Sequence, residues 1–130
     1  MYRAATDEDC QCAGSLAEMR NGYGGIAKPV PKHDPYAVSG DFNGDSAQDF
    51  AIVLVDSSKR RNQFVLAVFN GPYSRNTLQP AFVRAGLDLR GQGLFFYDDD
   101  PSLKPYCLVL GAFASEGQII RPVGKSYSLK

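Results

Sequence analysis

Oxygen-bearing side chains alternate along a short polar stretch near the middle of the chain. Asp41, Asn43 and Asp45 stand at every second position, and Asp49 follows a little later. A hard cation such as Ca²⁺ takes about six to eight oxygen ligands at roughly 2.3–2.6 Å, and a loop coiled around the ion supplies them from alternate residues. In the pattern D-x-[DN]-x-[DN], the next ligand is a backbone carbonyl, here that of Ala47. The spacing therefore predicts a calcium site formed by these residues.

Two positions depart from the full calcium-loop pattern. Ser46 stands where glycine normally makes a sharp turn, and a positive φ would cost it on the order of 1 kcal/mol. Gly44 is free to take up part of that turn. Ile52 stands where a bidentate glutamate normally closes the coordination shell. We therefore expect weak affinity, with a dissociation constant of about 10⁻⁴–10⁻³ M.

A plain turn is the alternative interpretation of the same stretch. Asn, Asp and Gly favour turns for their own conformational reasons, and an apolar run that predicts a buried strand follows at 50–55. However, so many carboxylate and amide oxygens in one short loop repel each other unless a cation lies among them. This repulsion favours the metal site over the plain turn.

The stretch from Gly40 to Asp45, together with Asp49 and the apolar run, resembles the calcium loop of FG-GAP/VCBS-type repeats. The resemblance covers roughly residues 38–56, and a second apolar run at 63–69 extends it. One copy is visible, so the multi-bladed propeller of the repeat proteins is not implied. Such loops also occur in small secreted bacterial proteins, including periplasmic inhibitors or immunity proteins that block cell-wall-degrading enzymes. The resemblance thus implies an extracytoplasmic calcium-binding protein of this kind.

The residue types in the sequence give little support for an enzyme. His33 is the sole histidine. Because adjacent side chains of an extended segment face opposite ways, His33 and Asp34 do not make a dyad, and we interpret His33 as an exposed connector residue. No nucleophile set, zinc spacing or cofactor fingerprint is recognisable. We predict a non-enzymatic domain that binds another protein through its loops at 57–62, 71–80 and 98–105. The alternative is a structural or adhesion module that binds a glycan or a cell-surface partner.

Composition limits the choice of partner and compartment. The chain has 130 residues, which suits a single domain, and its 14 basic residues balance its 14 acidic ones. This balance argues against nucleic acid or an anionic membrane as a partner. No apolar run approaches the roughly 18 residues of a membrane span. Because cytosolic calcium is too low to fill a weak site, we expect a periplasmic or secreted protein whose leader has been removed.

The predicted fold is α+β. Residues 7–20 read as one helix, with Thr6 as its cap and an apolar face on the side of Leu16. Residues 36–130 form a β-rich part that contains the calcium-type loop 41–49. We expect the helix to pack on a mainly antiparallel sheet of about seven short strands, in which 49–56 and 64–69 form a hairpin. The acidic run 98–100 reads as a solvated turn.

The cysteines leave two pairings open. Cys10 and Cys12 are close neighbours in sequence, and neighbours at this spacing rarely bridge each other. A bridge from one of them to Cys107 would close a loop of about 95 residues and add roughly 4 kcal/mol. The alternative is three free thiols that pack as small apolar groups.

Overall fold

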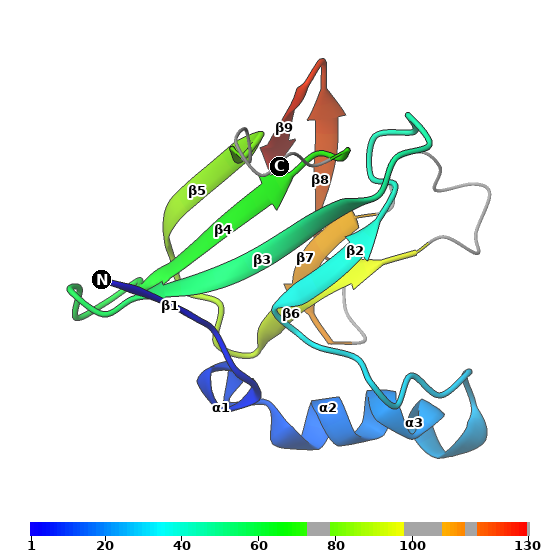
Figure 1. Cartoon of the computed structure of the whole chain (residues 1–130). Helices are drawn as coiled ribbons and strands as arrows, with labels where there is room; N and C mark the ends of the chain where they lie inside the picture. The colour runs from blue at the N-terminus through cyan, green and yellow to red at the C-terminus, as the bar shows by residue number, and fades with distance from the viewer. Residues whose placement is uncertain (73–78, 98–107, 114–116, 130) are drawn as a thin grey trace.

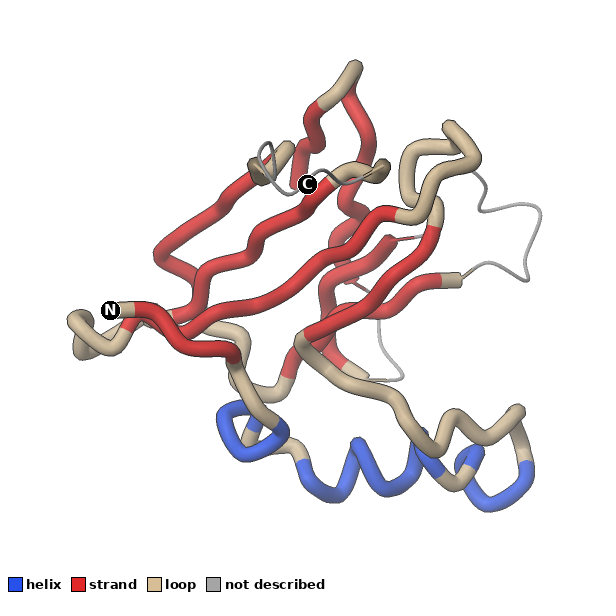
Figure 2. Tube along the Cα trace, viewed as in Figure 1, coloured by secondary structure: helices blue, strands red, loops and turns tan. Residues whose placement is uncertain are grey.

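The computed structural model describes residues 1–72, 79–97, 108–113 and 117–129. Across these residues the protein is mostly β, with two antiparallel sheets and short helical segments gathered at one end (Figures 1 and 2). In chain order the elements are β1 (Tyr2–Ala4), α1 (Asp7–Cys10), α2 (Ala13–Arg20), α3 (Gly22–Gly25), β2 (Ala37–Gly40), β3 (Asp49–Asp56), β4 (Phe64–Phe69), β5 (Phe82–Leu87), β6 (Gln92–Phe96), β7 (Leu108–Ala112), β8 (Gly117–Val123) and β9 (Ser126–Leu129).

The strand β3 organises the first sheet. It pairs with β4 in the predicted hairpin, with Phe50 opposite Phe69 and Val55 opposite Phe64. Its other edge is shared by two strands, because β2 pairs with its first half and β1 with its second half. The strand β5 then adds to β4. The predicted bounds of both hairpin strands, 49–56 and 64–69, are confirmed.

The second sheet is formed by β6, β7, β8 and β9, each antiparallel to the next. The hydrophobic core lies between the two sheets, since one buried cluster contains Val53 and Leu66 from the first sheet and Leu94, Leu110 and Ile120 from the second. Burial of these aliphatic side chains is the main driving force for bringing the sheets together. The prediction of an α+β fold, with a helix on a sheet of about seven strands, is therefore wrong.

The predicted helix 7–20 is in fact two helices with a break at Gln11. Gln11 has a left-handed backbone, with φ of 54°, and it ends α1. Cys10 and Cys12, on either side of it, form a disulfide with Cα atoms 5.2 Å apart. Both cysteines are buried in the core. This corrects the expected pairing with Cys107, which lies outside the described residues, and it also excludes three free thiols.

The strand β5 passes through Gly86 at a positive φ of 72° and shifts register against β4. One further expectation needs correction. His33 is half-buried rather than exposed, because its ring stacks on Phe95.

Several predicted features fall beyond the part of the chain that the structure describes. The acidic run 98–100 and the proposed contact loop 98–105 lie there, as does most of the loop 71–80. Among the described residues, no helix has the length and apolar character needed to cross a membrane.

Candidate metal centre

The acidic loop is a connection between two paired strands. Gly40, the last residue of β2, lies opposite Asp49, the first residue of β3, so residues 41–48 join the ends of an antiparallel pair. Phe42 anchors the loop from inside. Its side chain is fully buried, and its ring packs edge-on against Phe96 of the second sheet at a centroid distance of 5.2 Å. The loop is thus fixed at its base while its tip faces solvent.

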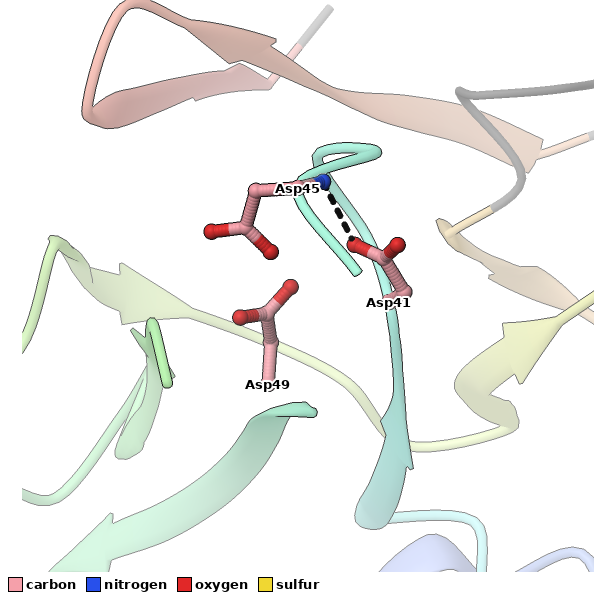
Figure 3. A group of neighbouring side chains, drawn as sticks. All are labelled: Asp41, Asp45 and Asp49. Atoms are coloured by element: carbon pink, nitrogen blue, oxygen red, sulfur yellow. Dashed lines mark hydrogen bonds between the residues drawn. The ribbon is translucent and has the colours of Figure 1, made fainter. Parts of the chain in front are cut away.

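Three of the predicted ligands converge in space. Carboxylate oxygens of Asp41, Asp45 and Asp49 all lie within 4.8 Å of one another. Figure 3 shows the Asp45 and Asp49 carboxylates turned toward each other, with Asp41 beside them. Asp45 is exposed, Asp41 is half-buried and Asp49 is fully buried, so the cluster extends from solvent to the edge of the core.

Backbone N–H groups shape the loop around Asp41. Its Oδ1 accepts hydrogen bonds from the N–H groups of Gly44 at 2.9 Å and Asp45 at 3.1 Å, and its Oδ2 accepts one from Ser46 at 2.8 Å. Asn43 Oδ1 accepts from the N–H of Asp45 at 3.3 Å, and Asp45 Oδ1 accepts from the N–H of Ala47 at 2.9 Å. These bonds hold the chain in a tight coil around the carboxylates.

The coil requires two left-handed residues. Gly44 has φ of 77° and Ser46 has φ of 69°. Glycine adopts this region freely, whereas for serine it costs roughly 1 kcal/mol. The strain predicted for Ser46 is therefore present, and the loop keeps the turn that a glycine would normally make.

Asp49 is held from the core side. Its Oδ2 accepts the N–H of Phe42 at 2.8 Å, and its Oδ1 accepts the N–H of Gly71 at 2.9 Å, both in buried surroundings. Burial raises the pKa of its carboxyl group, the two backbone donors oppose this rise, and the negative charges of Asp45 and Asp41 add to it. The folded protein therefore disfavours the ionised form of Asp49 in the absence of a neutralising partner.

Gly71 and Phe42 are site residues that the ligand pattern alone does not reveal. Gly71 follows β4, and a Cβ atom placed on it would overlap the carbonyl group of Gln48, so the close approach that brings its N–H to Asp49 requires glycine. The sequence Asn70-Gly71-Pro72 marks a turn at this point. Only the register of β3 with β4 shows that this turn returns to the start of β3.

The geometry allows the three carboxylates to share a metal ion. Each carboxylate oxygen has two lone pairs, so Asp41 Oδ2, Asp45 Oδ1 and both oxygens of Asp49, which each accept one backbone N–H, still have one lone pair to offer. Without a cation, charges about 5 Å apart repel each other by on the order of 1 kcal/mol per pair in water, and by more where Asp49 is buried. Asn43 and Ala47, the other predicted ligands, take part in the hydrogen bonds of the same coil.

Comparison of the chain with protein-family models, with curated proteins and with solved structures finds no match. The function of the protein is therefore inferred from its residues and their geometry.

Proposed function

We propose that this protein is a non-enzymatic, extracytoplasmic domain that is stabilised by Ca²⁺ and acts by binding another protein. The convergence of Asp41, Asp45 and Asp49 within 4.8 Å supports the metal-binding part. The ion would be structural, because it would neutralise the carboxylates and fix the point where the chain enters β3. Binding would then stabilise the folded protein by mass action.

A calcium ion is compatible with this spacing. Ligands of one Ca²⁺ ion at roughly 2.3–2.6 Å lie up to about 5 Å apart. The carboxylate oxygens, all within 4.8 Å of one another, fall inside this limit. The all-oxygen ligand set also favours a hard cation over zinc or copper.

The same geometry argues against use of the acids in glycoside hydrolysis. A glycosidase needs two carboxyl groups that both reach the sugar. Asp49 is fully buried, and both of its oxygens accept backbone N–H groups. It cannot contact a substrate, and this leaves the cluster better suited to an ion.

An exposed basic turn is a candidate contact surface for the partner. Arg60 and Arg61, between β3 and β4, are exposed, and within the described residues neither is part of an ion pair. With Arg90 they line a polar cavity of about 410 Å³. Free guanidinium groups are well suited to carboxylates of a partner. The likeness of residues 38–56 to FG-GAP/VCBS loops points to a cell-wall-degrading enzyme as that partner.

Inhibition of purified cell-wall hydrolases tests this function. The protein in millimolar calcium is added to a panel of glycan-cleaving and peptide-cleaving hydrolases acting on a cell-wall suspension, and complexes are sized by gel filtration. We expect a one-to-one complex with loss of lysis for at least one hydrolase. The double change Arg60→Ala with Arg61→Ala should weaken it, whereas the matched exposed change Lys125→Ala should not. If no hydrolase is bound or inhibited, the inhibitor function is wrong.

A glycan-binding adhesion module is the second candidate. It predicts sedimentation of the protein with the insoluble cell-wall polysaccharide itself, in the absence of any enzyme. This outcome, together with no hydrolase complex, would replace the inhibitor function while leaving the calcium site intact.

A further inference from the structure

The polar cavity beside the β3–β4 turn is assembled from three separate parts of the chain. The turn precedes β4, and the second part, the β5–β6 connection, follows β5. These two parts are neighbours because Phe64, the first residue of β4, pairs with Leu87, the last residue of β5 (Figure 1). Gln11 adds the third part. It is held beside the β5–β6 connection because the N–H of Gly91 donates to the carbonyl of Cys10 at 2.6 Å.

Positive charge dominates the lining that the structure describes. This lining contains Arg60, Arg61 and Arg90 against one acid, Asp88, so its net charge is +2. Arg90 is bound to Asp88 by two side-chain hydrogen bonds of 2.6 and 2.9 Å. Within residues 1–72, 79–97, 108–113 and 117–129, neither Arg60 nor Arg61 takes part in an ion pair. Since the whole chain is neutral, this unpaired charge is a local feature of the cavity.

Hydrogen bonds hold the segments that carry these arginines. In the β3–β4 turn, the N–H of Asp56 donates to the carbonyl of Gln63 at 2.7 Å, and the N–H of Lys59 donates to the carbonyl of Asp56 at 3.2 Å. The paired bonds to Asp88 limit the orientations of Arg90. Donors that are already ordered lose less conformational entropy when a ligand binds, so they bind it more tightly.

Two residues of the lining have a left-handed backbone. Four described residues other than glycine have a positive φ, and two of them, Gln11 at 54° and Asn62 at 50°, line this cavity. Asparagine tolerates this region, whereas glutamine is strained in it. The disulfide between Cys10 and Cys12 spans Gln11 and keeps the turn closed. Because backbone strain is concentrated at functional sites, it supports a binding role for the cavity independently of the charge.

Charge and size together define the ligand. Guanidinium groups bind phosphate oxygens through paired hydrogen bonds, and a phosphomonoester carries about two negative charges at neutral pH. This charge matches the +2 of the described lining, whereas a single carboxylate would neutralise half of it. The volume of about 410 Å³ lies within the range of small-molecule pockets, about 300–1,000 Å³. It therefore leaves room for the group that is esterified to the phosphate.

We propose that this cavity binds a small phosphomonoester through Arg60, Arg61 and Arg90. The phosphate group would accept hydrogen bonds from the three guanidinium groups, and the esterified group would occupy the rest of the cavity. This inference goes beyond the calcium site and the protein partner. Because the ligand would occupy arginines that the proposed partner also contacts, the two would compete for the protein.

A titration of the full chain in metal-free buffer, followed by NMR of its backbone amides, tests the proposal. The probes, at about pH 7.5 and constant ionic strength, are methyl phosphate with two charges, dimethyl phosphate with one, and inorganic phosphate. We expect methyl phosphate to shift the amide signals of Gln11, Asn62 and Arg90 in a saturable way. It should bind about tenfold more tightly than dimethyl phosphate, and at least as tightly as inorganic phosphate. Tighter binding of inorganic phosphate would overturn the ester as the ligand.

A matched pair of variants locates the site. Arg60→Gln combined with Arg61→Gln should weaken methyl phosphate binding by about tenfold or more, whereas the exposed change Lys125→Gln should leave it unchanged. Unfolding curves of both variants confirm that they fold. The proposal is overturned if the amide shifts do not saturate, if methyl and dimethyl phosphate bind equally, or if both variants bind alike. No hydrolase is present in this experiment, so its failure is distinct from failure of the inhibitor function.

Discussion

The two ends of β3 carry buried aspartates with opposite electrostatics. Asp49 at its start and Asp56 at its end are fully and almost fully buried. The pKa of Asp49 is raised, chiefly by burial and further by two neighbouring carboxylates. The pKa of Asp56 is lowered, chiefly by hydrogen bonds from the Ser58 hydroxyl and N–H at 2.6 and 3.0 Å, with Lys59 adding to the effect.

The contrast shows what a satisfied buried acid needs and what Asp49 lacks. Asp56 receives its stabilising partners from the turn that follows it, and its neighbouring charge is positive. Asp49 also receives two hydrogen bonds, yet its neighbouring charges are negative. A cation beside Asp49 would remove this difference. The comparison is therefore the physical basis for the proposed calcium site.

Removing the carboxylate of Asp49 or of Asp56 should change the free energy of unfolding more than any other substitution considered. Asp49→Ala leaves the buried N–H groups of Phe42 and Gly71 without an acceptor, at about 1–3 kcal/mol each, so we expect a loss of about 3 kcal/mol in the free energy of unfolding. Asp56→Ala should cost less, because Ser58 is exposed and water can replace the carboxylate. Urea unfolding measures both. Equal losses would contradict the contrast between the two ends of the strand.

The pH dependence of the metal-free protein should separate the two acids. Between the unfolded pKa of about 3.9 and its raised folded pKa, Asp49 holds a proton that the unfolded chain has lost. Its contribution to stability is therefore greatest at low pH and falls as the pH rises through the folded pKa. The contribution of Asp56 is present above about pH 3.9 and is lost as the pH falls through its lowered folded pKa.

Urea midpoints measured in chelator from neutral to acid pH, for the wild type and two variants, check these signs. Asp45→Asn removes one of the charges that raise the pKa of Asp49, so stability should depend less on pH in this variant. Asp56→Asn should instead reduce the loss of stability at the acid end. An unchanged profile for Asp45→Asn would show that repulsion within the cluster does not act on Asp49.

Relief of backbone strain at Ser46 or Asn62 should give the smallest change in the free energy of unfolding. Ser46 precedes Asp49 with φ of 69°, and Asn62 follows Asp56 with φ of 50°. Ser46→Gly removes the left-handed strain but adds chain entropy to the unfolded state, so we expect a net gain of about 0.5 kcal/mol in urea unfolding. Asn62→Gly should gain less, because asparagine tolerates this region better. The control Ser46→Ala keeps the strain, and a gain in it would argue against this explanation.

The loop and the β3–β4 hairpin could be predicted because their determinants are local. Alternate acids set the loop, and the apolar run that follows Asp49 sets the strand. The break at Gln11 could not be predicted from the sequence, because the turn there depends on distant contacts. Cys10 and Cys12 are buried in the core, and the N–H of Gly91 donates to the carbonyl of Cys10 at 2.6 Å.

Distant pairings explain the remaining errors. The first residues of the chain pair with β3, and the strands divide into two sheets around one core. No local sequence pattern indicates either arrangement. His33 reads as a connector residue in the sequence, and only the return of β6 brings Phe95 against it. Asp41, Asp45 and Asp49 were predicted as ligands, whereas the donors to Asp49 depended on strand register.

Thermal unfolding in about 10 mM calcium and in chelator tests the central claim most directly. With a dissociation constant of about 10⁻⁴–10⁻³ M, calcium should add about 1.4–2.7 kcal/mol and raise the wild-type midpoint by about 5–10 °C. Asp45→Asn should melt no lower than the wild type in chelator, since repulsion falls, yet should gain little from calcium. Asp88→Asn, an acid outside the loop, should keep the wild-type response to calcium. Identical wild-type midpoints in calcium and chelator would contradict the proposed site and leave the stretch a plain turn.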